Sequence, residues 1–279
     1  MNVRQLISRR SVAAVTGLLG MVSLAIGAHA ALNKRALDAA KAIGTEQTVG
    51  MAGKPSRLAL VIGNGHYPDA AAPLNQPIND ARALTATLRQ SGFDVDVVED
   101  ASKDDMQRAI GRLKSRIKPE TVVMLFFGGY GIQAGRESYM IPVDARIWKE
   151  GDIKREGISV ESVLETVKEK GAKAKLVVLD ASRRNPYERR FRSYSHGLAP
   201  ISAPHNALIL TSATPGKVAD DSKNANSVLV AELLSNLHRD GAGFESVFNK
   251  TRVAISRASD GEQVPSVSSS LTDEIRFGG

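Results

Sequence analysis

The stretch LALVIGNGHY, residues 58–67, decides the fold class of this 279-residue chain. Its first five residues form an unbroken apolar run that ends at Gly63. Such a run is typical of a parallel strand buried on both faces of a sheet. Similar runs follow at 121–127, 175–179 and 207–212, and residues 93–98 alternate as a fifth strand would.

Segments with helical spacing separate these runs. Residues 78–90 place Ala81, Leu84 and Leu88 on one face, and Gly92 is expected to end that helix. Ser102 is expected to cap the next one. The further helices are predicted at 103–117, 160–169, 228–237 and 244–256. Alternating strands and helices predict an α/β fold with a mostly parallel sheet of about six strands and helices on both faces.

The ligands of such sheets bind beyond the carboxyl ends of the strands, which directs attention to the loops after Ile62, Phe127 and Leu179. These loops hold the most distinctive motifs of the chain. They read LNQPINDAR (74–82), FFGGYG (126–131), YMIPVDA (139–145) and LDASRRNP (179–186).

In order and spacing, these motifs resemble those of bacterial members of the caspase and metacaspase peptidase family. The family pattern contains ALVIGN, then N-x-x-N-D-A, a strand ending G-H-G, IP-x-D-A, and a strand ending D-A-C-R-N-N-P. The resemblance runs from about Arg57 to Phe277 and includes ATPG (213–216) and QVPSVSSSL (263–271). It implies a caspase-like three-layer α/β fold and descent from a cysteine peptidase.

The sequence departs from the family at the two catalytic positions. The position of the catalytic His is Tyr130, and the position of the catalytic Cys is Ser182. The family mechanism needs a thiolate activated by an imidazole, and this chain has no cysteine at all. A neutral tyrosine, with an ordinary pKa of about 10, is a poor base near neutral pH. The sequence therefore predicts that cysteine-peptidase activity is absent.

A serine-type hydrolase that uses Ser182 is the alternative. It would need a base, for which the remaining histidines are His66, His196, His205 and His238. It would also need an oxyanion hole, which the Gly128–Gly131 loop could provide. His196 is expected to be an exposed loop residue, and His66 a packing or turn residue.

The acidic part of the family's site is retained. By resemblance, Asp80 and Asp180 line a pocket for basic side chains, and two carboxylates suit an arginine guanidinium. The alternative is that Asp80 caps its own helix and that Asp180 accepts backbone hydrogen bonds. The chain is thus expected to bind a basic peptide or a protein partner without cutting it.

A purely structural docking role is the third hypothesis. It rests on the basic cluster Arg183, Arg184, Arg189, Arg190 and Arg192, whose simplest interpretation is a solvated loop.

The first 30 residues resemble an export signal. Three arginines precede an apolar run that ends in Ala28-His-Ala30, where cleavage is expected. An uncleaved membrane anchor and a twin-arginine route are the alternatives. The predicted organisation is a signal peptide at 1–30, a linker or short helix at 31–56 and one domain at 57–279. We expect a periplasmic or secreted protein, with no membrane contact after cleavage.

The composition argues against several other classes. A formal net charge of +7, without a dense basic stripe, does not indicate a nucleic-acid partner. No dinucleotide, phosphate-loop or zinc motif is present, so no cofactor and no metal are expected. Asp220, Asp221 and Asn224 lack the ligand set of a calcium loop.

Overall fold

The computed structural model describes residues 56–68, 73–187, 197–219, 224–237 and 241–277. Contacts divide the chain into Met1–Gly53 and Lys54–Gly279, and every described residue belongs to the second unit. The predicted signal peptide, and the linker up to residue 55, lie outside the described residues.

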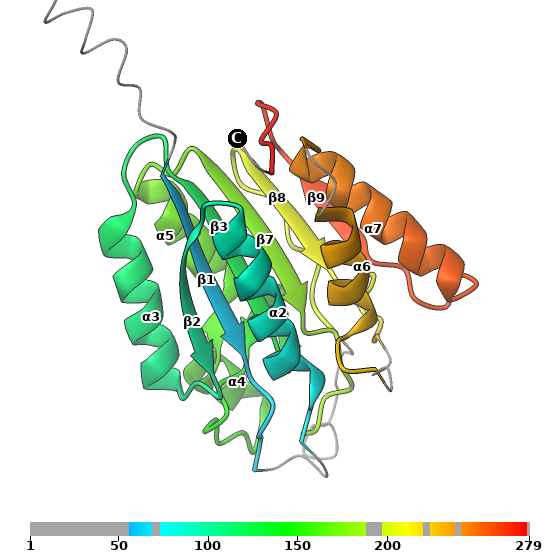
Figure 1. Ribbon diagram of the computed structural model, residues 1–279. Coiled ribbons are helices and arrows are strands. Elements are labelled where there is room, and N and C mark those ends of the chain that lie inside the picture. Colours follow the sequence, from blue (N-terminus) through cyan, green and yellow to red (C-terminus); the bar gives the residue numbers. More distant parts are fainter. Residues whose placement is uncertain (1–55, 69–72, 188–196, 220–223, 238–240, 278–279) are drawn as a thin grey trace, which may run out of the picture. The chain divides into compact units, whose positions relative to one another are not determined.

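A six-stranded sheet forms the centre of the domain (Figure 1). Neighbouring strands are parallel except for the last pair, in which β9 runs antiparallel to β8. In spatial order the strands are β2 (Asp94–Glu99), β1 (Arg57–Gly63), β3 (Val122–Gly128), β7 (Ala174–Asp180), β8 (Ala207–Thr211) and β9 (Ser266–Ser269). The predicted mostly parallel sheet is confirmed.

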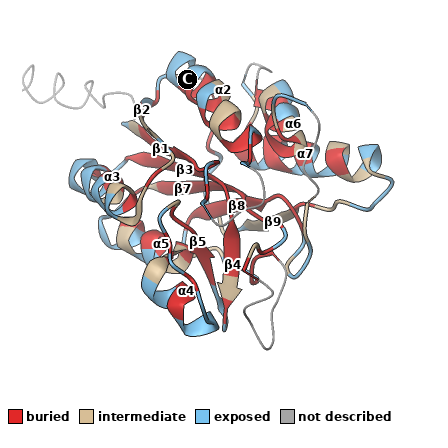
Figure 2. Ribbon diagram, turned by 90° about the horizontal axis from the view of Figure 1, so that it is seen from below, coloured by how far each residue is buried: buried red, intermediate tan, exposed pale blue. Residues whose placement is uncertain are grey.

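Five helices cover the two faces of this sheet, and each face has its own apolar core. Along β1, Ala59 and Val61 face one core, and Leu58, Leu60 and Ile62 face the other. Figure 2 shows the buried strands between helices whose outer surfaces are exposed. The first core contains α2 (Gln76–Gln90), α6 (Val228–Leu237) and α7 (Phe244–Ala258), and the second contains α3 (Lys103–Arg116) and α5 (Val160–Glu169).

The helix boundaries follow the predicted signals. The Ser102 side chain accepts the Asp105 N–H, and the Asp105 carboxylate accepts the Ser102 N–H, each at 3.2 Å. After α2, Gly92 adopts a φ of +80°, a conformation that favours glycine.

A small three-stranded sheet was not predicted. It consists of β4 (Gly131–Ala134), β5 (Glu137–Met140) and β6 (Ile158–Ser159), with α4 (Glu150–Glu156) beside it. Its own apolar cluster includes Ile132, Ile141, Ile147 and Ile153. Strands of two to four residues are too short for a periodicity to be visible in the sequence.

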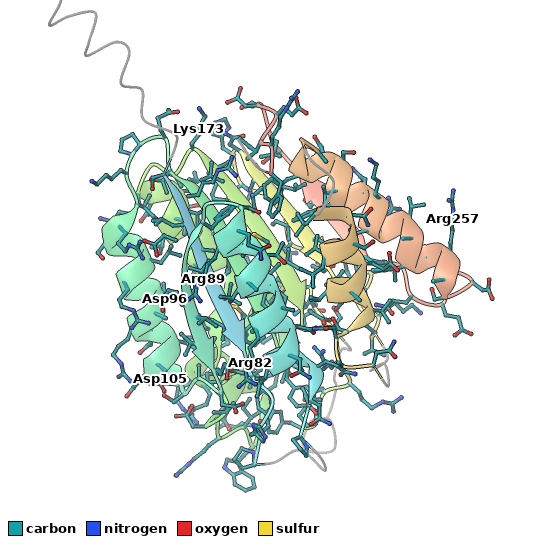
Figure 3. The ribbon with its side chains drawn as sticks, viewed as in Figure 1. Arg82, Arg89, Asp96, Asp105, Lys173 and Arg257 are labelled. Atoms are coloured by element: carbon teal, nitrogen blue, oxygen red, sulfur yellow. The ribbon has the colours of Figure 1, made fainter. Side chains whose placement is uncertain are left out.

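Ion pairs connect the edge strand β2 to its helices. Asp96 accepts from Arg112 of α3 at 2.8 Å, and Glu99 accepts from Arg82 of α2 at 2.6 Å. Arg82 and Asp96 are labelled in Figure 3. Exposed pairs of this kind contribute little stability, so the two cores carry the fold. Within the described segments, no helix is both long and apolar enough to cross a membrane.

Candidate functional site

The carboxyl ends of three neighbouring strands bring the distinctive loops together. Gly63 of β1, Gly128 of β3 and Asp180 of β7 lie opposite one another in the register of the sheet. The N-terminus of α2 packs against this edge, because a Cβ on Gly63 would lie 2.4 Å from the carbonyl oxygen of Pro77. The loops predicted to hold the site therefore meet at the carboxyl end of the sheet.

Backbone hydrogen bonds hold the loop of Tyr130 against the loop of Ser182. The Gly129 N–H donates to the Asp180 carbonyl at 3.2 Å, and the Gly131 N–H donates to the Ala181 carbonyl at 2.9 Å. A Cβ on Gly131 would lie 2.8 Å from both the carbonyl oxygen and the Cβ of Ala181. Tyr130 and Ser182, the positions predicted to match the family's catalytic pair, thus belong to adjacent, tightly packed loops.

Tyr67 organises the buried surroundings of Tyr130. Its ring packs edge-on against the Tyr130 ring, with centroids 4.7 Å apart. Its hydroxyl accepts the Tyr130 N–H at 3.1 Å and donates to the Ile141 carbonyl at 2.9 Å. Burial raises the pKa of this hydroxyl well above its ordinary value, so Tyr67 stays neutral. Tyr67 was not among the residues predicted to form the site, although it lies in the loop that follows the first strand.

Ser182 is placed unlike an activated nucleophile. It is 1% exposed, and its Oγ has no hydrogen-bond partner among the described residues. Its backbone is fixed on both sides, because its N–H donates to Ser212 Oγ at 3.3 Å and its carbonyl accepts from Ala219 at 2.7 Å. A hydroxyl without a hydrogen-bonded base is a weak nucleophile.

The histidines that could serve as a base are paired elsewhere, lie at the other end of the sheet or lie outside the described residues. The His66 side chain is 65% exposed, and its Nδ1 lies 2.6 Å from Asp100 Oδ2. His205 is exposed and precedes β8, at the amino end of the sheet. His196 and His238 lie outside the described residues. His66 was expected to be a packing or turn residue. It does not pack, because its ring is exposed and paired, but it does lie in a turn, across which the Tyr67 N–H donates to the Gly65 carbonyl at 3.3 Å.

The proposed oxyanion hole is also occupied from within the domain. The N–H groups of Gly129, Tyr130 and Gly131 donate to Asp180, Tyr67 and Ala181 respectively. An oxyanion hole needs donors aimed at the substrate oxygen, and these three already have acceptors. The expectation that this loop offers free donors is therefore wrong for these three groups.

Asp80 lies in the second turn of α2 and is fully buried. It does not cap its own helix, because Asn75 occupies the N-cap. Its Oδ1 instead accepts the Ser227 N–H at 3.0 Å and the Asn226 amide at 2.8 Å, just before α6. Its Oδ2 has no hydrogen-bond partner in the described part of the chain. Burial, and then the charge of Asp180, raise the pKa of Asp80 to about 6.

Asp180 is buried at the end of β7 and lies within electrostatic reach of Asp80. Arg183 comes close to it. Its guanidinium donates to the Gly129 carbonyl at 3.0 Å and to the Asp180 carbonyl, and lies 3.4 Å from Asp180 Oδ2. The solvated-loop interpretation is wrong for Arg183, whose side chain is 5% exposed. It holds for the exposed Arg184, and the other three arginines of the cluster lie outside the described residues.

Two asparagines that the sequence analysis passed over also shape this edge. The Asn64 amide donates to the Ile141 carbonyl at 3.2 Å, and its oxygen accepts the Ala101 N–H at 2.8 Å. Asn185 is buried, and its Nδ2 has no described partner. Both residues fall inside quoted motifs, which was the available signal. Within the described segments, no group of three or more His, Asp or Glu residues is arranged to hold a metal ion.

Comparisons with known proteins agree with this architecture. The Caspase domain family matches residues 56–276. Mucosa-associated lymphoid tissue lymphoma translocation protein 1 of Homo sapiens is 29% identical over 145 residues, which are 51% of this chain and 17% of that protein. Its Mus musculus homolog is 29% identical over 134 residues, which are 47% of this chain and 16% of the homolog. The chain thus matches only about a sixth of the length of these relatives.

Proposed function

The chain belongs to the Caspase domain family, and from that premise we propose that it is an exported pseudo-peptidase that binds basic peptides without cleaving them. The observation that supports the loss of activity best is the buried Ser182 Oγ, which has no described hydrogen-bond partner. With Tyr130 at the other catalytic position, neither a thiolate nor an imidazole is available there.

The binding part of the proposal rests on two buried carboxylates. Asp80 and Asp180 lie at the carboxyl end of the sheet, where ligands of α/β folds bind. Of the buried side-chain atoms that lack a described partner, Asp80 Oδ2, Ser182 Oγ and Asn185 Nδ2 belong to the motifs at this edge. Buried polar atoms are normally satisfied, so a bound molecule with cationic and polar groups would complete this set.

The serine-hydrolase alternative has less support. Ser182 Oγ is sequestered, and the N–H groups of Gly129, Tyr130 and Gly131 are already bonded. Covalent labelling of Ser182 by a fluorophosphonate at neutral pH would revive it. The docking alternative loses Arg183 from its basic surface, because that side chain is buried.

Restoring both catalytic groups tests the loss of chemistry. We expect Tyr130→His with Ser182→Cys to cleave fluorogenic arginyl or lysyl peptides, while wild type and Ser182→Cys alone do not. Cleavage by wild type would overturn the assignment as a pseudo-peptidase.

Binding is tested separately by titrating an acetylated arginine peptide into wild type, Asp180→Asn and Asp104→Asn. Asp104 is an exposed carboxylate on α3 and serves as the matched control. We expect Asp180→Asn alone to lose affinity. Equal affinities in all three proteins would argue against ligand binding at Asp180.

The export part of the proposal is tested by expression in a Gram-negative host. We expect the periplasmic protein to begin at Ala31 when its N-terminus is sequenced. A full-length product that stays with the membrane fraction would support the anchor alternative.

A further inference from the structure

Arg183 puts a basic group next to the carboxylate that the proposed function assigns to a basic ligand. Its guanidinium contacts the Gly129 carbonyl at 3.0 Å and lies 3.4 Å from Asp180 Oδ2, and it also donates to the Asp180 carbonyl. Its side chain is 5% exposed and that of Asp180 is 4% exposed. The cation is therefore almost entirely removed from water.

This placement matches what an external arginine would need. A guanidinium carries five N–H donors in a planar fork, and the edge of the sheet offers two carbonyl oxygens and a carboxylate to it. Arg183 comes only three residues after Asp180, so it meets these acceptors from within the same loop. The site is thus complementary to an arginine side chain that the chain itself supplies.

We propose that Arg183 is a built-in competitor, which occupies Asp180 in the free protein and must leave before a basic ligand can bind. The inference rests on the proposed function, because it assumes that the ligand uses Asp180. It adds a regulatory step to that site, in which the affinity for a ligand is set by how readily Arg183 is displaced.

Two features make Arg183 displaceable. Its 3.4 Å approach to Asp180 Oδ2 is long beside the roughly 2.7–2.9 Å of a strong charge-assisted hydrogen bond. In addition, Asp80 Oδ2 is fully buried and has no described partner, although it lies within reach of the charge of Asp180. An incoming cation could gain this second carboxylate as well as the first.

The expected size of the effect follows from populations. If the site is open in a fraction f of molecules, the apparent dissociation constant is the intrinsic one divided by f. A competitor that closes the site in nine molecules of ten or more weakens binding by about tenfold or more. Removing the guanidinium should recover that factor.

The test compares Arg183→Gln with wild type in the full chain, with Arg184→Gln as the control. Arg184 is the exposed neighbour, so the control makes the same charge change without touching the site. The probes are acetyl-arginine amide and its neutral isostere acetyl-citrulline amide, titrated by calorimetry. Thermal unfolding is followed with and without each probe.

We expect Arg183→Gln to bind the arginine probe about tenfold or more tightly than wild type does, and Arg184→Gln to match wild type. The variant should melt lower than wild type, because Asp180 is left buried and unpaired. The arginine probe should restore its melting temperature, and the citrulline probe should not.

Two results distinguish failure of the competitor inference from failure of the proposed function. If wild type binds the arginine probe and Arg183→Gln binds it no better, Arg183 is a structural residue and the competitor is ruled out. If neither protein binds, the proposed binding of basic peptides fails and the competitor fails with it. Should Arg183→Gln not fold, Arg183→Met removes the cation while keeping a long side chain, and unchanged affinity in that variant would also overturn the inference.

Discussion

The Asp80 carboxylate accepts the backbone N–H of Ser227 at 3.0 Å, across 147 positions of sequence. One oxygen of a buried acid in α2 thereby satisfies the amide at the start of α6. Helix N-termini leave such amides without intrahelical partners. Asp80 therefore links α2 to the start of α6, in addition to its proposed role in binding a basic ligand.

The first prediction concerns the pH dependence of stability. The pKa of Asp80 is raised from 3.8 to about 6, so the folded state binds this proton more tightly than the unfolded state. The stabilisation is present below about pH 4 and is lost as pH rises through 6. Relative to Asp80→Asn, wild type should lose on the order of 2–3 kcal/mol over this window.

Urea unfolding of both proteins from pH 4 to pH 7 measures that difference. Asp104→Asn, at an exposed position, should follow wild type throughout. Parallel curves for wild type and Asp80→Asn would show that Asp80 does not titrate in this range.

A second prediction addresses Tyr67. Tyr67→Phe removes the hydroxyl that bridges the Tyr130 N–H and the Ile141 carbonyl, and leaves both buried groups without it. We expect a loss of about 1–3 kcal/mol in the free energy of unfolding. Tyr139→Phe is the control, because the Tyr139 hydroxyl bonds the exposed Glu137 and should matter less. Equal losses in the two variants would refute a special role for Tyr67.

The third prediction concerns Ser182→Ala. Its hydroxyl is buried without a described partner, so removing it deletes no described hydrogen bond. It also removes the unfavourable free energy of burying a polar group that has no hydrogen bond. We expect the free energy of unfolding to be unchanged or raised by up to about 1 kcal/mol. A clear loss of stability would mean that Oγ is hydrogen-bonded after all.

The fourth prediction contrasts two glycines. An alanine Cβ at Gly63 would lie 2.4 Å from the Pro77 carbonyl oxygen, which the packed α2 helix holds in place. Gly63→Ala should therefore cost about 2 kcal/mol or more. Gly111 in α3 has nothing within 4 Å of such a Cβ, so Gly111→Ala should gain about 1 kcal/mol. Thermal unfolding of both variants checks this, and similar shifts would contradict it.

Much of the fold could be predicted from local patterns. The bounds of α5 and α6 match the predicted ranges residue for residue, because amphipathic spacing and flanking signals are local properties. The small sheet could not be predicted in this way. Its strands are too short, and they exist because β4 folds back on β5, with Ile132 opposite Tyr139, and β5 pairs on its other side with β6, with Met140 opposite Ile158.

For the candidate site too, local sequence predicted some features and only the tertiary structure showed the others. Its location followed from the order of strands and loops, and the positions of Tyr130 and Ser182 followed from the motifs. The partners could not be read from the sequence, because Asp80 meets Asn226 from 146 positions away. Arg183 looked like one of several loop arginines, and only the tertiary structure separates it from the exposed Arg184.

The burial of Ser182 has a practical consequence. Because the chain has no cysteine, Ser182→Cys would introduce its only thiol, at a position that is 1% exposed. A thiol reagent could modify it only when the loop opens, so the labelling rate would report the frequency of local opening. The substitution that would restore the family's cysteine would thus supply a kinetic probe of how often the carboxyl end of the sheet opens to solvent.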